Sequence, residues 1–181
     1  MSGSLHPIIF EKKELLTSSV ASRNALLGEL LSAPGTTNYL LPELRIVQLT
    51  VNQVLYEQGD QIDLVYFPLD SVVSGLAIME DGTTIETSMV GRDGLVGISA
   101  VLGSGHSQQW NWVSIGGKAL QLDAKVLDKL FVQNEVALKA LLKYYRSLIT
   151  QLSQPPKERA SLVRIVKERR HCHQPDKLNS L

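Results

Sequence analysis

The sequence predicts an α+β fold built mainly from antiparallel β-strands, with short helices before the strands and one long helix after them. Two observations predict this class. Between residues 46 and 122, short apolar runs alternate with turn residues at close spacing, which is typical of a β-roll or jelly-roll sandwich. On either side of that region, apolar residues recur with the period of an α-helix.

The first elements are helical. Residues 1–21 show no sustained hydrophobic pattern and are expected to form an N-terminal arm. Ser22 is expected to cap a helix that runs to about Leu31 and stops before Pro34-Gly35. A second short helix is expected near residues 39–44.

The strands follow, and turn residues separate them. Gln58-Gly59-Asp60 indicates a turn, and Glu80-Asp81-Gly82 predicts a hairpin, because Asp-Gly tolerates the positive φ of tight turns. The apolar runs on either side of these turns predict strands at residues 46–51, 54–56, 64–67, 72–79, 83–90, 110–115 and 119–122. Together with the flanking helices they define a domain over residues 22–134.

Two helices are predicted after the strands. Asp123 is expected to cap a helix that runs to about Phe131, and a longer helix fills residues 135–154, where Pro155-Pro156 ends it. Large residues recur along the longer helix three and four positions apart, which is the spacing of a helix–helix seam: Leu138, Leu141, Tyr145, Leu148 and Leu152. A second stripe, Leu142 and Ile149, is expected to pack on the roll. The seam predicts a homodimer, and the alternative is one broad apolar face buried within a single subunit.

Composition limits the class of protein. The chain has 181 residues, 44% of them hydrophobic, and a formal net charge of +0, so charge gives no overall attraction to nucleic acid or membrane. Cys172 is the sole cysteine, which fits a reducing cytoplasm. No apolar run approaches the roughly 18–20 residues of a membrane helix. We therefore expect a cytoplasmic protein that has no membrane partner.

The segment at residues 90–103 is the most informative part of the chain. It contains four glycines between an apolar strand and a short apolar helix-like run. Glycine permits positive φ and close approach of the backbone, and the first amides of a short helix suit an anion. The alternative is a strand-to-helix connection in which the glycines only form turns.

The order of these elements resembles the effector domain of Crp/Fnr-type transcription regulators, which has the cyclic nucleotide-binding-domain fold. The resemblance covers about residues 23–154, and its most specific part is Val90-Gly91-Arg92-Asp93-Gly94-Leu95-Val96-Gly97 after Asp81-Gly82. It implies a β-roll that binds a small effector and a long helix that dimerises. It also implies a C-terminal DNA-binding domain, which needs roughly seventy residues or more. Residues 155–181 are a basic tail too short for that domain, so we expect DNA contact only through a domain that this chain lacks.

The resemblance further implies a phosphate-binding cassette, in which Gly-Glu is followed about ten residues later by Arg-Ser or Arg-Thr. Here Gly97 matches the glycine, Ile98 stands at the glutamate position, and Ser107-Gln108 fall near the arginine. Because charged hydrogen bonds contribute roughly 1.5–3 kcal/mol each, losing both weakens binding about a hundred- to ten-thousand-fold. Tight cAMP or cGMP binding in this way is therefore not expected. The candidate effector-binding residues are Arg92, Gly97, Ile98, Ser99, Ala100, Ser107 and Gln108.

These observations favour a dimeric effector-sensing domain of a Crp/Fnr-like regulator, with no resident cofactor and no metal site. We do not expect an enzyme, because no nucleophile, base and acid combination is visible. One alternative is a protein- or DNA-interaction module that acts through the basic tail. The other is a cupin-like metal-dependent enzyme, which needs several histidines, whereas residues 23–154 contain only His106.

Overall fold

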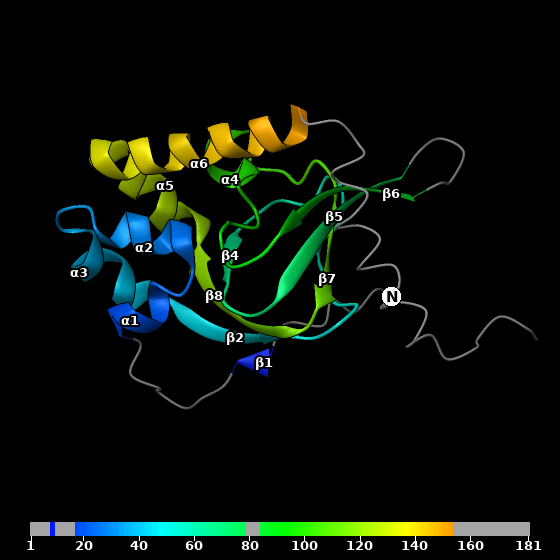
Figure 1. Cartoon of the computed structure of the whole chain (residues 1–181), viewed down its shortest axis with the longest axis horizontal. Helices are drawn as coiled ribbons and strands as arrows, with labels where there is room; N and C mark the ends of the chain where they lie inside the picture. Colours follow the sequence, from blue (N-terminus) through cyan, green and yellow to red (C-terminus); the bar gives the residue numbers. More distant parts are fainter. Residues whose placement is uncertain (1–7, 10–16, 79–83, 154–181) are drawn as a thin grey trace, which may run out of the picture. The chain divides into compact units, whose positions relative to one another are not determined.

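The computed structural model describes residues 8–9, 17–78 and 84–153 (Figure 1). The chain forms two compact units, residues 1–144 and residues 145–181. All of the described strands and the helices α1 to α5 lie in the first unit, and the boundary falls within α6 (Glu135–Ser153). The predicted Glu80-Asp81-Gly82 turn and the basic tail at residues 155–181 lie outside the described residues.

Within the described residues, the strands form two four-stranded antiparallel sheets. The first sheet has the order β1 (Ile8–Ile9), β2 (Arg45–Leu49), β8 (Gly117–Asp123) and β4 (Leu64–Pro68). The second has the order β3 (Val54–Tyr56), β7 (Trp110–Ile115), β5 (Val72–Ile78) and β6 (Thr84–Val90). The predicted strands are therefore confirmed, and β5 and β6 pair as the expected hairpin, with Ile78 opposite Thr84.

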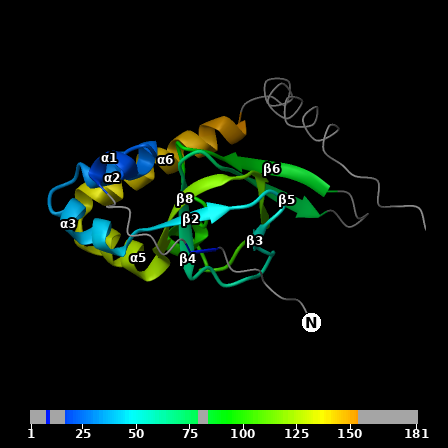
Figure 2. The ribbon, with the colours of Figure 1, turned by 90° about the horizontal axis from the view of Figure 1, so that it is seen from below.

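Short helices cover one end of this roll. They are α1 (Ser18–Ala21), α2 (Ala25–Leu31), α3 (Thr36–Leu40) and α5 (Ala124–Gln133), and a 3-10 turn, η1 (Leu41–Glu43), follows α3. Figures 1 and 2 show these helices at the end of the first unit that lies away from the tips of β5 and β6. A further short helix, α4 (Ser99–Leu102), follows the glycine-rich segment, as the sequence predicts.

The core lies between the two sheets and beneath these helices. Phe67 on β4 pairs with Leu120 on β8, and both side chains are fully buried. Val73 and Val113 pair across the second sheet and are 1% and 0% exposed. Burying side chains of this size stabilises the fold by roughly 1.5–3 kcal/mol each.

The helix boundaries near the N-terminus differ from the prediction. Ser22 ends α1 rather than starting the next helix, and Asn24 is the N-cap of α2. The reason is that Asn24 is fully buried and makes several bonds that a surface serine could not. Its Oδ1 accepts from the Leu27 N–H at 3.0 Å, and its Nδ2 donates to Pro68 O at 3.0 Å and Gly94 O at 2.9 Å.

Other boundaries shift by a few residues. The second short helix begins at Thr36, directly after Gly35, whose φ of +79° forms the turn. The segment expected to be an arm contains β1, which pairs with β2, and α1. Asp123 is confirmed as the cap of α5, where its Oδ1 accepts from the Lys125 N–H at 2.7 Å. No helix in the described residues is long and apolar enough to span a membrane.

Replacing Asn24 tests how much its cap and its two carbonyl bonds contribute. Asn24→Ala should lower the free energy of unfolding by about 2–4 kcal/mol, because it removes a helix cap and leaves two buried carbonyls without a donor. Asn38→Ala, on the exposed side of α3, is the matched control and should change it by less than about 0.5 kcal/mol. Urea denaturation measures both variants. Equal effects would contradict the role given to Asn24.

Candidate functional site

The backbone of the glycine-rich segment is held by three other elements. Arg92 O accepts from the Ala25 N–H of α2 at 2.8 Å, next to the bond between Asn24 and Gly94 O. Val96 pairs with Tyr66 of β4 through two backbone bonds of 2.9 and 3.1 Å. On the side of α6, the Leu95 N–H donates to Tyr144 Oη at 3.2 Å. The segment that leads into α4 is therefore fixed relative to α2, β4 and the first part of α6.

Two glycines of this segment are required by close contacts. A Cβ on Gly94 would collide with Tyr144 Oη, so only glycine lets the tyrosine reach Leu95. Burial raises the pKa of the Tyr144 phenol, which keeps it neutral. Gly97 has a φ of +91°, and a Cβ there would meet Ile62 Cγ2 at 3.0 Å. Gly97 thus starts the turn into α4 beneath the loop before β4.

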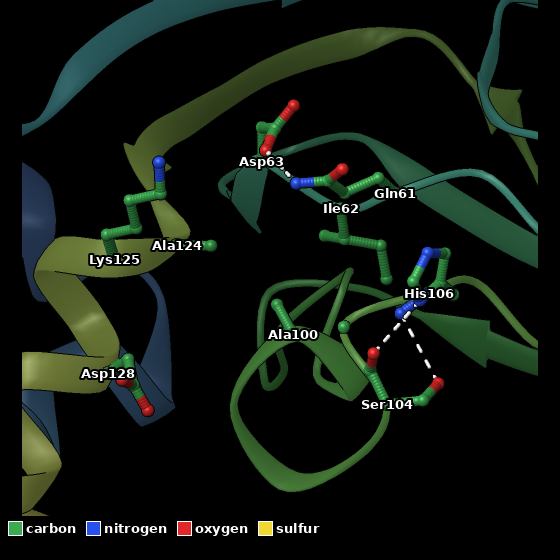
Figure 3. A pocket seen from close by; sticks show the side chains of 10 residues that line it. Gln61, Ile62, Asp63, Ala100, Ser104, His106, Ala124, Lys125 and Asp128 are labelled. Carbon is green, nitrogen blue, oxygen red and sulfur yellow. Dashed lines mark hydrogen bonds between the residues drawn. The ribbon is translucent and has the colours of Figure 1, made fainter.

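The predicted effector-binding residues do not all line the same site. Ile98 precedes α4 and packs against the hydrophobic core, and Arg92 is exposed. Ser99 and Ala100 lie half-buried in α4, and Ala100 lines an open cavity outside the roll (Figure 3).

Of the predicted pair Ser107-Gln108, Ser107 is buried and Gln108 lies on the surface. Ser107 is 3% exposed, and its Oγ donates to Gln109 O at 2.7 Å. Gln108 is exposed, and its Nε2 donates to Ser104 Oγ at 3.2 Å and to His106 O at 3.4 Å. The residue whose side chain turns into the second sheet is the next one, Gln109.

Gln109 lies directly over Gly75 of β5. Its Nε2 donates to Ser88 Oγ at 2.8 Å, and its Oε1 accepts from Thr87 Oγ1. A Cβ on Gly75 would collide with the Gln109 amide, so the missing side chain leaves the space that this amide fills. Asn111 extends the network, because its Nδ2 donates to Ser107 Oγ at 2.9 Å and Gln109 O at 3.1 Å.

These side chains form what we call the neutral polar site, on the inner face of the second sheet: Thr87, Ser88, Ser107, Gln109 and Asn111. Gly75 is two residues from Val73, whose side chain lies in the core, so the two positions share the inner face. Gly75 pairs with Ser88 on one side and with Asn111 on the other. All of the side chains in the network are uncharged amides and hydroxyls.

A β-bulge lets β6 contribute two neighbouring residues to this site. Gly75 pairs with Ser88 and Leu76 pairs with Glu86, so Thr87 is an extra residue opposite this step. Neighbouring side chains of a regular strand point to opposite faces of the sheet, and a bulge interrupts this alternation. The hydroxyls of Thr87 and Ser88 therefore both reach Gln109. On the other face, Ser74 Oγ donates to Glu86 Oε1 at 3.0 Å, which keeps that carboxylate in a separate contact.

Sequence reasoning missed Gln109, Thr87, Ser88 and Asn111. Hydroxyl and amide residues are common in strands, and nothing in their spacing marks the bulge that brings them together. It also missed Asn24 and Tyr144, whose partners lie 70 and 49 residues away along the chain. The glycines of the segment were the one signal that pointed to close contacts there.

The predicted seam residues whose burial is described, Leu138, Leu141, Tyr145 and Leu148, differ in exposure along α6. Leu141 is fully buried in the core of its own chain, and Leu138 is half-buried against that core. This corrects the assignment of Leu141 to the seam, because its side chain has no surface left for a partner. The prediction that Leu142 packs on the roll is also wrong, since Leu142 is 40% exposed. Tyr145, Leu148 and Leu152 follow on α6 in the second unit.

The described residues contain no group of three or more His, Cys, Asp or Glu side chains that could hold a metal ion. His106 lies in the exposed loop after α4, where its Nδ1 is 2.9 Å from Ser104 O. This arrangement does not provide the ligand cluster that the cupin alternative requires.

Comparison with known proteins identifies the fold. No family model matches the chain, and no curated protein matches it in sequence. Among solved structures, it is similar to the N-terminal domain of a transcriptional regulator from Streptomyces coelicolor A3(2), with 24% identity and a TM-score of 0.54. That match covers 73% of this chain and 91% of the other.

Two further structures give the same result. A cyclic nucleotide-binding domain from Methylobacillus flagellatus matches with 15% identity and a TM-score of 0.57, over 91% of this chain and 88% of the other. The catabolite activator protein of Thermus thermophilus matches with 14% identity and a TM-score of 0.56. That match covers 75% of this chain but 62% of the activator, less than two thirds of its length. The chain therefore has the β-roll fold of cyclic nucleotide-binding domains, which confirms the fold implied by its sequence.

A double-mutant cycle tests the contact between Gly75 and Gln109. Gly75→Ala should lower the free energy of unfolding by about 1–2 kcal/mol, because the new methyl group displaces the Gln109 amide from its hydrogen bonds. In the Gln109→Ala background the same change should cost less, because only the Ser88 hydroxyl then lies in the path of the methyl group, giving a coupling of about 1 kcal/mol in urea denaturation. Gly91→Ala is the control, since a Cβ there meets only Asp93 Oδ1 at 3.7 Å. Additive effects would show that the two residues do not touch.

Proposed function

We propose that this chain is the effector-sensing domain of a Crp/Fnr-like regulator, that it acts as a homodimer, and that it has changed its ligand. The observation that carries the proposal is the neutral polar site in a β-roll of the cyclic nucleotide-binding type. The relatives in fold are described as a domain of a transcriptional regulator, a cyclic nucleotide-binding domain and an activator protein.

The chemistry of the site argues against a cyclic phosphate. An anion moved from water into a half-buried site needs a cation or several donors to replace its hydration. In the neutral polar site, the Gln109 and Asn111 amide groups already donate to Ser88, Ser107 and a backbone carbonyl. The side chain at the cassette's glutamate position, Ile98, packs against the core. The site therefore suits an uncharged polar effector better than a nucleotide.

Tyr144 is the proposed link between the site and α6. It accepts from Leu95, three residues before Ile98 and four before the start of α4. A shift of α4 and its loop would change this contact and with it the position of the first turns of α6. An effector can drive such a change only if it binds the two arrangements with different affinity.

The proposed dimer uses a different stripe from the one predicted. On α6, Leu142, Tyr145 and Ile149 are spaced three and four residues apart and are 40%, 41% and 47% exposed. Such spacing places them in one row along the helix, as a seam requires. We propose that this row, rather than the row through Leu141, contacts a second copy.

The remaining parts of the proposal follow from the sequence. They are a cytoplasmic location, no resident cofactor and no catalytic activity. The alternative function through the basic tail concerns residues 155–181, outside the described residues.

Ligand pairs that differ only in a phosphate test the effector site. In a thermal unfolding series, cAMP should stabilise the protein no more than adenosine does, and cGMP no more than guanosine. A ligand at a hundred times its Kd would stabilise the fold by about 2.7 kcal/mol, which raises Tm by roughly 5–10 °C. A shift of that size with cAMP and not with adenosine would contradict the proposal, because it would require phosphate recognition.

Sedimentation velocity tests the dimer. Leu142→Glu should give a folded monomer, because it places a charge in the apolar row. Val132→Glu, on the 81% exposed Val132 of α5, adds the same charge elsewhere and should leave the dimer intact. Leu141→Ala should lower the free energy of unfolding by about 2–5 kcal/mol without dissociating the dimer. A Leu142→Glu variant that still dimerises would rule out this row.

A further inference from the structure

A concave site lies outside the roll, separate from the neutral polar site. It is an open cavity of about 330 Å³ between α4 with its loop, the turn before β4, and the first turns of α5. Its apolar lining comes from Ile62 and Ala124, which are 5% and 6% exposed, and from half-buried Ala100. The size suits a small metabolite.

Backbone hydrogen bonds tie the three walls of this cavity together. The Ile62 N–H donates to Gly105 O at 2.9 Å, which joins the turn to the loop after α4. The Ala124 N–H donates to Asp63 O at 2.8 Å, which joins the same turn to α5. Because the walls are already connected, a ligand would meet a largely formed site and would not have to order it.

Charged groups surround the apolar lining on opposite sides. Figure 3 shows Lys125 and Asp128 of α5 on one side of the cavity, with Gln61, Asp63 and His106 on the other. Asp63 Oδ1 accepts from Gln61 Nε2 at 3.0 Å. Among the described residues, the side chains of Lys125 and Asp128 form no ion pair, so both are available to a ligand.

We propose that this cavity binds a free basic amino acid with an aliphatic stem, of the lysine type. The stem would lie on Ile62, Ala100 and Ala124. The two ammonium groups would pair with the two carboxylates, Asp63 and Asp128, while the carboxylate would pair with Lys125. Two carboxylates and one ammonium in the cavity thus match two ammonium groups and one carboxylate in the ligand. This inference is independent of the proposed effector site in the roll.

Three ligands, of which two lack one charged group of the third, test whether the charges of the ligand pair with those of the cavity. L-lysine, 1,5-diaminopentane, which lacks the carboxylate, and 6-aminohexanoate, which lacks the α-ammonium, are each titrated into the ¹⁵N-labelled full chain. Amide chemical shifts of Ile62, Gly105 and Lys125 should saturate with L-lysine at a Kd in the low millimolar range, about fivefold tighter than with either analogue.

Variants identify the pairing residues. Lys125→Gln should weaken L-lysine about fivefold but should not weaken 1,5-diaminopentane, whose two ammonium groups lose a nearby like charge, whereas Asp128→Asn should weaken both. Glu43→Gln, which removes an exposed carboxylate on η1, is the charge control and should change neither. The proposal fails if L-lysine gives no saturable shifts up to about 20 mM, or if the three ligands bind equally. It also fails if Lys125→Gln weakens 1,5-diaminopentane as much as L-lysine.

Discussion

The hydrogen bonds that fix the backbone at residues 92–96 are the constraint on which the rest of the first unit depends. Asn24 bonds to Gly94 from the side of α2, and Tyr144 accepts from Leu95 from the side of α6. Gly94 allows the approach of Tyr144, because a side chain there would collide with the tyrosine hydroxyl. Through these bonds, the helices at the two ends of the domain's sequence meet the segment that leads into α4. The three elements are thus joined by direct hydrogen bonds rather than through intervening residues.

The turn into α4 combines the backbone geometry of a short helix start with side chains that carry no charge, since residues 97–102 contain no ionisable group. The short helix and the glycine before it are present, since Gly97 has the positive φ that the turn needs and α4 follows it. Ile98 beside that turn packs on the core, and a network of amides and hydroxyls lies on the inner face of the second sheet. Fold resemblance alone does not identify a ligand, which has to be inferred from the side chains present.

The long helix illustrates the limit of periodicity. Leu138, Leu141, Leu142 and Tyr145 fit two overlapping rows with equally good three- and four-residue spacing. Only packing separates them, because Leu141 is fully buried in the core whereas Leu142 is exposed. The row available to a partner is set by which side of the helix the core occupies. A sequence pattern of two heptads does not contain that information.

The sequence by itself determined the fold class, most strand positions, the cap at Asp123 and the short helix after the glycines. These features depend on neighbouring residues, through alternation, turn chemistry and capping, so a local pattern is enough to predict them. Tertiary structure alone decided that Asn24 is buried against Pro68 and Gly94, that Gln109 rather than Gln108 turns inward, and that a bulge brings the Thr87 and Ser88 hydroxyls to the same side chain. Each of these depends on a partner more than twenty residues away or on the register between strands. Local sequence does not encode such pairings, because the partners meet only when the two sheets and the helices have packed together.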